Sequence, residues 1–124
     1  MQKPERICLL LVEDDVLVRM TLALMLEDEG FSVVEAATAA EAQQLMQDGL
    51  DTMVVVTDVD LGAGPSGAEL ADWMHGQRPD VAIIFITGRV ASLAGRRLDM
   101  REAILPKPFE GSELSELVRK MILQ

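Results

Sequence analysis

LLLVEDDV, residues 9–16, places an apolar run directly against three consecutive acidic residues, Glu13, Asp14 and Asp15. Two like charges about 4 Å apart repel by roughly 4 kcal/mol at an effective dielectric constant of about 20. A buried strand that ends in such a cluster therefore needs a compensating partner, unless the side chains spread into water. A divalent cation is one such partner, and it would turn the cluster into a binding site.

The composition is that of one ordinary domain. The chain has 124 residues, of which 49% are hydrophobic, and a chain of this length can bury most of the surface that its unfolded form exposes. Its apolar runs stay below the roughly 18 residues that a membrane span needs, and the acidic residues after Val12 come too early for a signal peptide. We therefore expect a single domain over residues 1–124 that stays in the cytoplasm, with no effector domain after Gln124.

Charge and cysteine content exclude further classes of protein. The formal net charge is −10, whereas nonspecific nucleic-acid binding requires basic side chains that displace counterions from phosphates. With one cysteine, Cys8, and one histidine, His75, the chain has no internal disulfide and no zinc-type Cys/His set. We interpret Cys8 as a small core residue and His75 as solvated surface. Five basic residues of one late stretch are also interpreted as solvated surface, with a binding face for an acidic partner as the alternative: Arg89, Arg96, Arg97, Arg101 and Lys107.

Strand-like and helix-like segments alternate from end to end. Short apolar runs predict strands over residues 7–12, 31–36, 53–57, 81–86 and 103–106. Apolar residues at helical spacing predict helices over residues 16–29, 39–47, 68–77 and 111–123. A fifth, weaker helical segment follows residue 88, because Gly88 and Gly95 lower helix propensity by about 1 kcal/mol each relative to alanine.

Five strands that alternate with five helical segments predict a parallel sheet with helices on both faces. The strands support this arrangement because their apolar runs are unbroken, whereas a sheet with one solvated face shows alternation. Ligands of such folds bind outside the carboxyl ends of the strands. The last residues of each strand are therefore the place to look for chemistry.

Polar side chains collect at this edge of the predicted sheet. The first strand ends in the acids at 13–15, the third in Asp58 and Asp60, the fourth in Thr87 and the fifth in Lys107. Each alone has an ordinary explanation as a helix cap, a loop acid or a surface charge. Together, clustered carboxylates suit Mg²⁺, and a carboxylate nucleophile assisted by metal, lysine and hydroxyl suits phosphoryl transfer.

Four motifs in this order resemble a known family. They are VEDD at 12–15, TDVDL at 57–61, ITG at 86–88 and LPKPF at 105–109. The set resembles the receiver domain of response regulators in two-component signalling, and the resemblance covers essentially the whole chain. It implies a flavodoxin-like, doubly wound α/β fold with five parallel strands in the order 2-1-3-4-5.

The resemblance implies a role for each residue that takes part in phosphoryl transfer. Asp58 matches the phosphoacceptor, Thr87 matches the hydroxyl that turns toward the phosphoryl group, and Lys107 matches the lysine that pairs with it. The peptide bond between Lys107 and Pro108 would be cis, a form largely confined to bonds that precede proline.

The resemblance also implies a metal site. Mg²⁺, for which Mn²⁺ can substitute, would be held by Asp14, by Asp58 and by the main-chain carbonyl of Asp60. Glu13 would act through water, and Asp15 would cap the first helix.

The function that the resemblance implies is that of a phosphoacceptor rather than a turnover enzyme. A sensor histidine kinase or a histidine phosphotransfer protein would supply the phosphoryl group. The phosphorylated domain would change conformation and signal through protein contacts at the fourth helix, fifth strand and fifth helix, with a phosphorylation-dependent homodimer as one form of output. No direct nucleic-acid or membrane partner is expected.

Three features depart from the common family pattern. Ile104 stands where the family has a switch aromatic residue, three positions before the lysine. The loop GAGPSG at 62–67 is one residue longer than the common form and resembles loops of receivers that stand alone or belong to hybrid kinases. Gly88 and Gly95 flank the segment that corresponds to the family's fourth helix.

Two alternative functions remain open at this point. A degenerate receiver that acts only as an interaction module is favoured by Ile104, although every expected site residue is retained. The run VVVTDVDLG at 54–62 also resembles the nucleophile motif of haloacid dehalogenase-type phosphatases. Those enzymes normally carry this motif on the first strand and need a longer chain.

Overall fold

A five-stranded sheet forms the centre of the computed structural model, which describes residues 6–123. All neighbouring strands are parallel, and their order is β2-β1-β3-β4-β5. The strands are β1 (Cys8–Val12), β2 (Ser32–Ala36), β3 (Val54–Asp58), β4 (Ala82–Thr87) and β5 (Glu102–Pro106). This arrangement confirms the predicted flavodoxin-like fold and its strand order.

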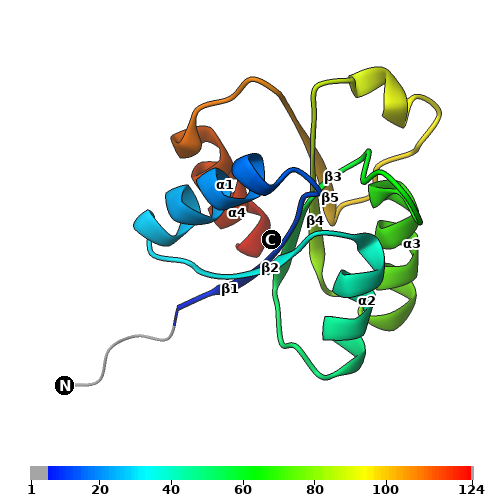
Figure 1. Ribbon diagram of the computed structural model, residues 1–124, viewed down its shortest axis with the longest axis horizontal. Helices are drawn as coiled ribbons and strands as arrows, with labels where there is room; N and C mark the ends of the chain where they lie inside the picture. The colour runs from blue at the N-terminus through cyan, green and yellow to red at the C-terminus, as the bar shows by residue number, and fades with distance from the viewer. Residues whose placement is uncertain (1–5, 124) are drawn as a thin grey trace.

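Helices cover both faces of the sheet (Figure 1). On one face lie α1 (Val16–Asp28) and α4 (Gly111–Ile122), and on the other lie α2 (Ala39–Gln47) and α3 (Gly67–Gln77). Among the described residues, no helix is both long and apolar enough to cross a membrane.

The sheet separates two hydrophobic cores. In β1, Leu9 and Leu11 pack against α1 and α4, whereas Leu10 and Val12 pack against α2 and α3. All four side chains are fully buried, because successive residues of a strand point to opposite faces. This explains why the strands are unbroken apolar runs in the sequence.

The connection between β4 and β5 differs from the prediction. In place of the weak helix expected after residue 88, it holds a short 3₁₀ turn, η1 (Val90–Leu93), which buries Leu93 against the α2–α3 face. Gly95 follows with a φ of 84°, a left-handed conformation that suits glycine and ends the turn. The helix expected between β4 and β5 is therefore reduced to a single turn, and the chain that follows runs without helix to β5.

Two side chains interpreted as solvated surface are largely buried. The His75 side chain is 18% exposed, and its Nε2 lies 3.2 Å from the carbonyl oxygen of Val81. The Arg96 side chain is 17% exposed and forms a 2.6 Å ion pair with Glu102, the first residue of β5. Both interpretations were wrong, because partners distant in the sequence cover these side chains.

Helix caps fix where α1 and α2 begin. Asp15 accepts a hydrogen bond from the Val18 amide at 3.1 Å, which confirms it as the cap of α1. Thr38 caps α2 by accepting from the Glu41 amide at 3.1 Å. The Glu41 carboxylate accepts from the Ala37 amide at 2.8 Å, one residue before the position that a capping box would use.

Candidate functional site

The carboxyl ends of four strands bring the predicted site residues to one edge of the sheet. Val12 of β1 is in register with Thr57 of β3, so Glu13 and Asp58 follow on neighbouring strands. Thr87 ends β4 in register with Pro106 of β5, and Lys107 comes next. The Lys107–Pro108 peptide bond is cis, as expected.

Lys107 joins two carboxylates of this edge. Its Nζ donates to Oδ2 of Asp58 at 2.9 Å and lies 3.6 Å from Oε1 of Glu13. Burial by itself lowers the pKa of Lys107, but the hydrogen bond to Asp58 and the charges of both acids outweigh it, so the pKa is raised. Lys107 therefore stays an ammonium group, available to neutralise negative charge beside Asp58.

Glu13 is an almost fully buried acid, with 2% of its side chain exposed. Its Oε2 has no hydrogen-bond partner among the described residues. Burial raises the pKa of Glu13 to about 7, since the opposing effect of Lys107 is offset by the nearby carboxylates of Asp58 and Asp14. An unpartnered buried oxygen costs free energy and fits a site that a water or cation completes.

Asp58 remains accessible, with 14% of its side chain exposed. Its Oδ1 accepts from the Asp60 amide at 3.1 Å, while Lys107 occupies Oδ2. Asp14 and Asp60 are both exposed around it. The loop after β3 approaches Asp14 closely, because a Cβ added to Gly62 would lie 3.4 Å from Oδ2 of Asp14.

Thr87 lies at the edge but points its hydroxyl elsewhere. The side chain is buried, and its Oγ1 accepts from the Arg89 amide at 2.9 Å. Thr87 is tied to Lys107 through the backbone, because the Lys107 amide donates to its carbonyl oxygen at 2.8 Å. The hydroxyl thus connects the site to the segment that contains η1.

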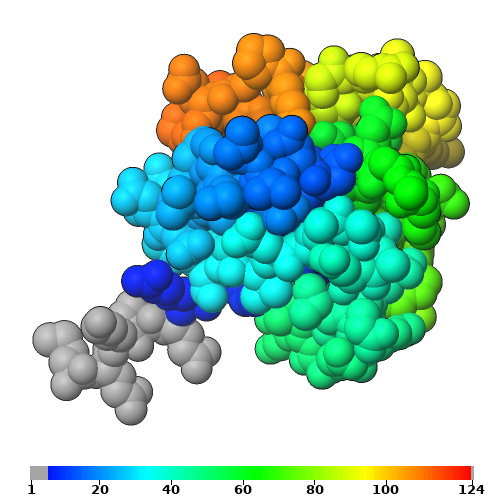
Figure 2. Space-filling view, viewed as in Figure 1, coloured from blue at the N-terminus to red at the C-terminus, as the bar shows by residue number. Residues whose placement is uncertain are grey.

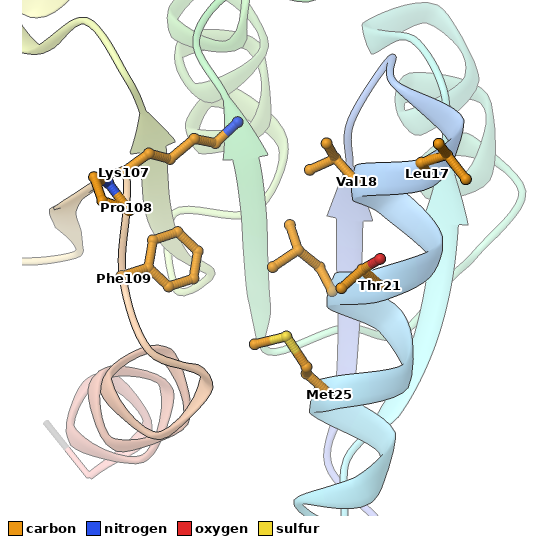
Figure 3. Close-up of a pocket in the computed structure, with 8 residues that line it drawn as sticks. Leu17, Val18, Thr21, Met25, Lys107, Pro108 and Phe109 are labelled. Atoms are coloured by element: carbon orange, nitrogen blue, oxygen red, sulfur yellow. The ribbon is translucent and has the colours of Figure 1, made fainter.

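An apolar groove of about 430 Å³ lies beside Lys107, between α1 and the segment after β5. Its walls are Leu17, Val18, Thr21, Leu22 and Met25 from α1, and Lys107, Pro108 and Phe109 from the other side (Figure 3). In the space-filling view, the surface of α1, in blue, borders the orange segment after β5 (Figure 2). No motif in the sequence indicates this groove.

The groove continues onto apolar side chains that α1 exposes to solvent. They are Val16, Leu17, Met20 and Leu24, which are 51–76% exposed. Large contiguous apolar patches mark interaction sites on soluble proteins, and these four side chains lie on one helix beside an apolar groove. The apolar residues of α1 therefore serve both the core and an exposed face next to Lys107.

Replacing Glu13 by glutamine should stabilise the metal-free protein at pH 8 and not at pH 5. Burial raises the Glu13 pKa from its ordinary 4.5 to about 7. Between pH 4.5 and pH 7 the folded state therefore binds more protons than the unfolded state does. Stability therefore falls as the pH rises through this window. We expect a gain on the order of 2 kcal/mol at pH 8, measured by urea unfolding in EDTA. An equal gain at pH 5 would show that the raised pKa of Glu13 is not the reason for the stabilisation.

Comparison with known proteins decides the family. The family model described as "Response regulator receiver domain" matches residues 9–119. The chain belongs to the response regulator receiver family. As a receiver domain it is a signalling domain of a two-component system, and this assignment replaces the alternative hypothesis of a haloacid dehalogenase-type phosphatase.

Relatives of this receiver domain include both regulators and kinases. It is 34% identical to aerobic respiration control protein ArcA of Escherichia coli K12 over 98% of its length, and 34% identical to sensor kinase CckA of Brucella abortus over 91%. The chain spans 50% of ArcA and 12% of CckA. A response regulator receiver protein from Sinorhizobium medicae shares the fold, with a TM-score of 0.82, 23% identity and 96% coverage of both chains.

Proposed function

We propose that this receiver domain accepts a phosphoryl group on Asp58 from a phosphohistidine donor, either a sensor histidine kinase or a histidine phosphotransfer protein. The observation that carries the proposal is the 2.9 Å contact between Lys107 Nζ and Asp58 Oδ2 at the carboxyl edge of the sheet. An accessible carboxylate with a fixed ammonium beside it is a nucleophile whose product charge is already compensated.

The proposed transfer is a displacement at phosphorus. A carboxylate oxygen of Asp58 forms the new P–O bond as the P–N bond to the donor imidazole breaks, and the imidazole leaves with the electron pair of that bond. The Lys107 ammonium, which already contacts the carboxylate, would neutralise negative charge at the transferred group, and the Asp60 amide would donate a hydrogen bond beside it. Thr87 can reach the phosphoryl oxygens only by releasing the Arg89 amide, so transfer would be felt in the segment around η1.

The residues present fit a divalent cation. The carboxylates of Asp14 and Asp58 and the main-chain carbonyl of Asp60 would hold Mg²⁺ or Mn²⁺, with Glu13 acting through water. The buried, unpartnered Oε2 of Glu13 and its pKa, which burial raises and the carboxylates of Asp58 and Asp14 raise further, support this assignment, because a cation would offset both the lost hydration and the repulsion. When bound, the cation would neutralise charge on the oxygens of the transferred group.

The first experiment is the intact mass of the protein after incubation with acetyl phosphate and Mg²⁺. We expect the parent to gain one phosphoryl group and the Asp58→Asn variant to gain none. A parent that gains nothing at any Mg²⁺ concentration would favour the alternative, a phosphorylation-independent interaction module. Ile104 and the Thr87 hydroxyl, which binds the Arg89 amide, are the observations that support this alternative. A gain in the variant equal to that of the parent would place the acceptor elsewhere.

The donor would dock on the groove beside Lys107. A phosphohistidine that reaches Asp58 must bring its own protein surface over the start of α1, where Leu17 is 76% exposed. Replacing Leu17 by lysine should therefore slow phosphorylation by a histidine donor about tenfold, since it costs roughly 1.4 kcal/mol of apolar burial.

A comparison with acetyl phosphate as the donor shows whether Leu17→Lys affects the docking of the donor protein or the phosphoryl transfer itself. Acetyl phosphate needs no docking surface, so Leu17→Lys should leave its rate unchanged. Met53→Lys is the matched control, because Met53 is 47% exposed and directly precedes β3, at the opposite edge of the sheet. Equal slowing with both donors would contradict the docking assignment.

A further inference from the structure

A second group of metal-binding side chains lies far from Asp58, at the amino edge of the sheet. Nδ1 of His75, near the end of α3, is 3.6 Å from Oε2 of Glu102 and 3.7 Å from Oδ2 of Asp99. The three potential ligand atoms all lie within 4.8 Å of one another. Glu102 opens β5, and Asp99 precedes it in the same segment.

The histidine is held with its free nitrogen facing the acids. Nε2 of His75 lies 3.2 Å from the carbonyl oxygen of Val81. A carbonyl only accepts hydrogen bonds, so Nε2 carries a proton in this contact, and in the neutral form of the ring Nδ1 is the nitrogen with a free lone pair. A ligating histidine typically binds a backbone carbonyl or carboxylate through its other nitrogen in this way.

The spacing fits a shared cation better than hydrogen bonds. Nitrogen–oxygen hydrogen bonds are about 2.7–3.2 Å long, so the separations of 3.6 and 3.7 Å are too long for direct bonds. A tetrahedral ion with ligand bonds of about 2.0–2.2 Å places neighbouring ligand atoms about 3.3–3.6 Å apart. The two separations from Nδ1 of His75, 3.6 and 3.7 Å, lie close to this range, and the two carboxylate oxygens lie within 4.8 Å of each other.

The surroundings supply charge and support for a cation. Arg96 donates to Glu102 Oε2 at 2.6 Å and contacts Asp72 at 3.0 Å, which orients the buried Glu102 carboxylate. Each carboxylate oxygen has a second lone pair, so this contact leaves Glu102 able to bind an ion. Asp72, Asp99 and Glu102 together with Arg96 carry a net formal charge of −2, which a divalent ion balances.

We propose that His75, Asp99 and Glu102 form a binding site for a zinc-type divalent transition-metal ion. The imidazole ligand favours such an ion over Mg²⁺, which prefers oxygen. The Asp99 side chain is 60% exposed, which leaves a route for the ion and a coordination position for water. The bound ion ties α3 to the segment that leads into β5, and the site is independent of the proposed phosphoacceptor site.

The test is a Zn²⁺ titration of the full chain in saturating Mg²⁺. Calorimetry measures the affinity and the number of ions bound, and NMR monitors the ¹⁵N resonances of the imidazole ring. His75 is the single histidine of the chain, so these resonances report on this site alone. We expect binding of one Zn²⁺ with a large shift of the Nδ1 resonance. Zn²⁺ that leaves the imidazole resonances unchanged would overturn the proposal.

Matched variants distinguish ligands from general charge. His75→Gln and Asp99→Asn should each weaken Zn²⁺ binding at least tenfold, and Asp99 is exposed enough for its variant to fold normally. Asp72→Asn removes the same charge without removing a ligand and should change the affinity less than threefold. Asp58→Asn should bind Zn²⁺ as the parent does. Equal weakening in Asp72→Asn and Asp99→Asn would reduce the site to a diffuse charge effect and overturn the proposal.

Discussion

Replacing Arg96 by alanine should lower the free energy of unfolding by about 3 kcal/mol, measured by urea unfolding at pH 8 in EDTA. The Glu102 side chain is 2% exposed, and Arg96 is its bidentate partner, with contacts of 2.6 and 3.3 Å. Removing one partner of a buried ion pair leaves an uncompensated charge, which costs more than the intact pair contributes. The guanidinium also lies 5.2 Å from the centre of the Phe85 ring, so its loss removes packing as well.

Three further variants separate charge from packing at this position. Arg97→Ala changes the neighbouring exposed arginine and should alter stability by less than about 0.5 kcal/mol. Arg96→Met keeps apolar contact with Phe85 but should remain destabilised, because Glu102 stays unpaired. Adding Glu102→Leu to Arg96→Met should restore most of the loss. A loss below about 1 kcal/mol in Arg96→Ala would show that the pair is solvated.

The fold could be predicted because its strands are buried on both faces. Side chains such as Leu9 and Leu10 enter opposite cores, so strand identity is written in unbroken apolar runs that need no knowledge of partners. The parallel arrangement then follows from the alternation of strands and helices. The strand order came from the family resemblance, and the structure confirms it.

The segment between β4 and β5 could not be predicted in the same way. Two glycines lower its helix propensity, but propensity alone does not show what conformation replaces a helix. The segment is held by Leu93, which enters the α2–α3 core, and by Arg96, which binds Glu102 and Asp72. Such contacts join residues that local patterns treat separately, which is why Arg96 and His75 were interpreted as surface.

For the candidate site, sequence supplied the residues and structure supplied their orientation. The position of Asp58 and Lys107 after buried strands predicts that they meet, and their side chains lie 2.9 Å apart. The orientation of the Thr87 hydroxyl toward the Arg89 amide depends on the course of the following loop, which no spacing rule gives. The exposed apolar face of α1 was not predicted, because helical spacing identifies a stripe of apolar residues but does not show whether the apolar residues outside that stripe are covered.

Replacing Gly67 by alanine should destabilise the protein by about 2–3 kcal/mol and displace the proposed phosphoacceptor. Gly67 is the first residue of α3, and its amide donates to the Val59 carbonyl oxygen at 2.7 Å. A Cβ at this position would lie 2.0 Å from the carbonyl oxygen of Asp58, a distance that real Cβ atoms do not show. The obstacle is backbone, so no side-chain rotation relieves it, and the start of α3 must move away from the end of β3.

Gly76 provides the matched control within the same helix. A Cβ added there meets nothing within 4 Å, so Gly76→Ala should raise stability by about 0.5–1 kcal/mol through helix propensity. The two alanine variants should therefore shift the urea midpoint in opposite directions, which Trp73 in α3 can report by fluorescence. If Asp58 is the acceptor, Gly67→Ala should also slow phosphorylation by acetyl phosphate, and Gly76→Ala should not. A Gly67→Ala protein as stable as the parent would mean that α3 is free to shift against β3, and the fixed geometry proposed for Asp58 would then lose its support.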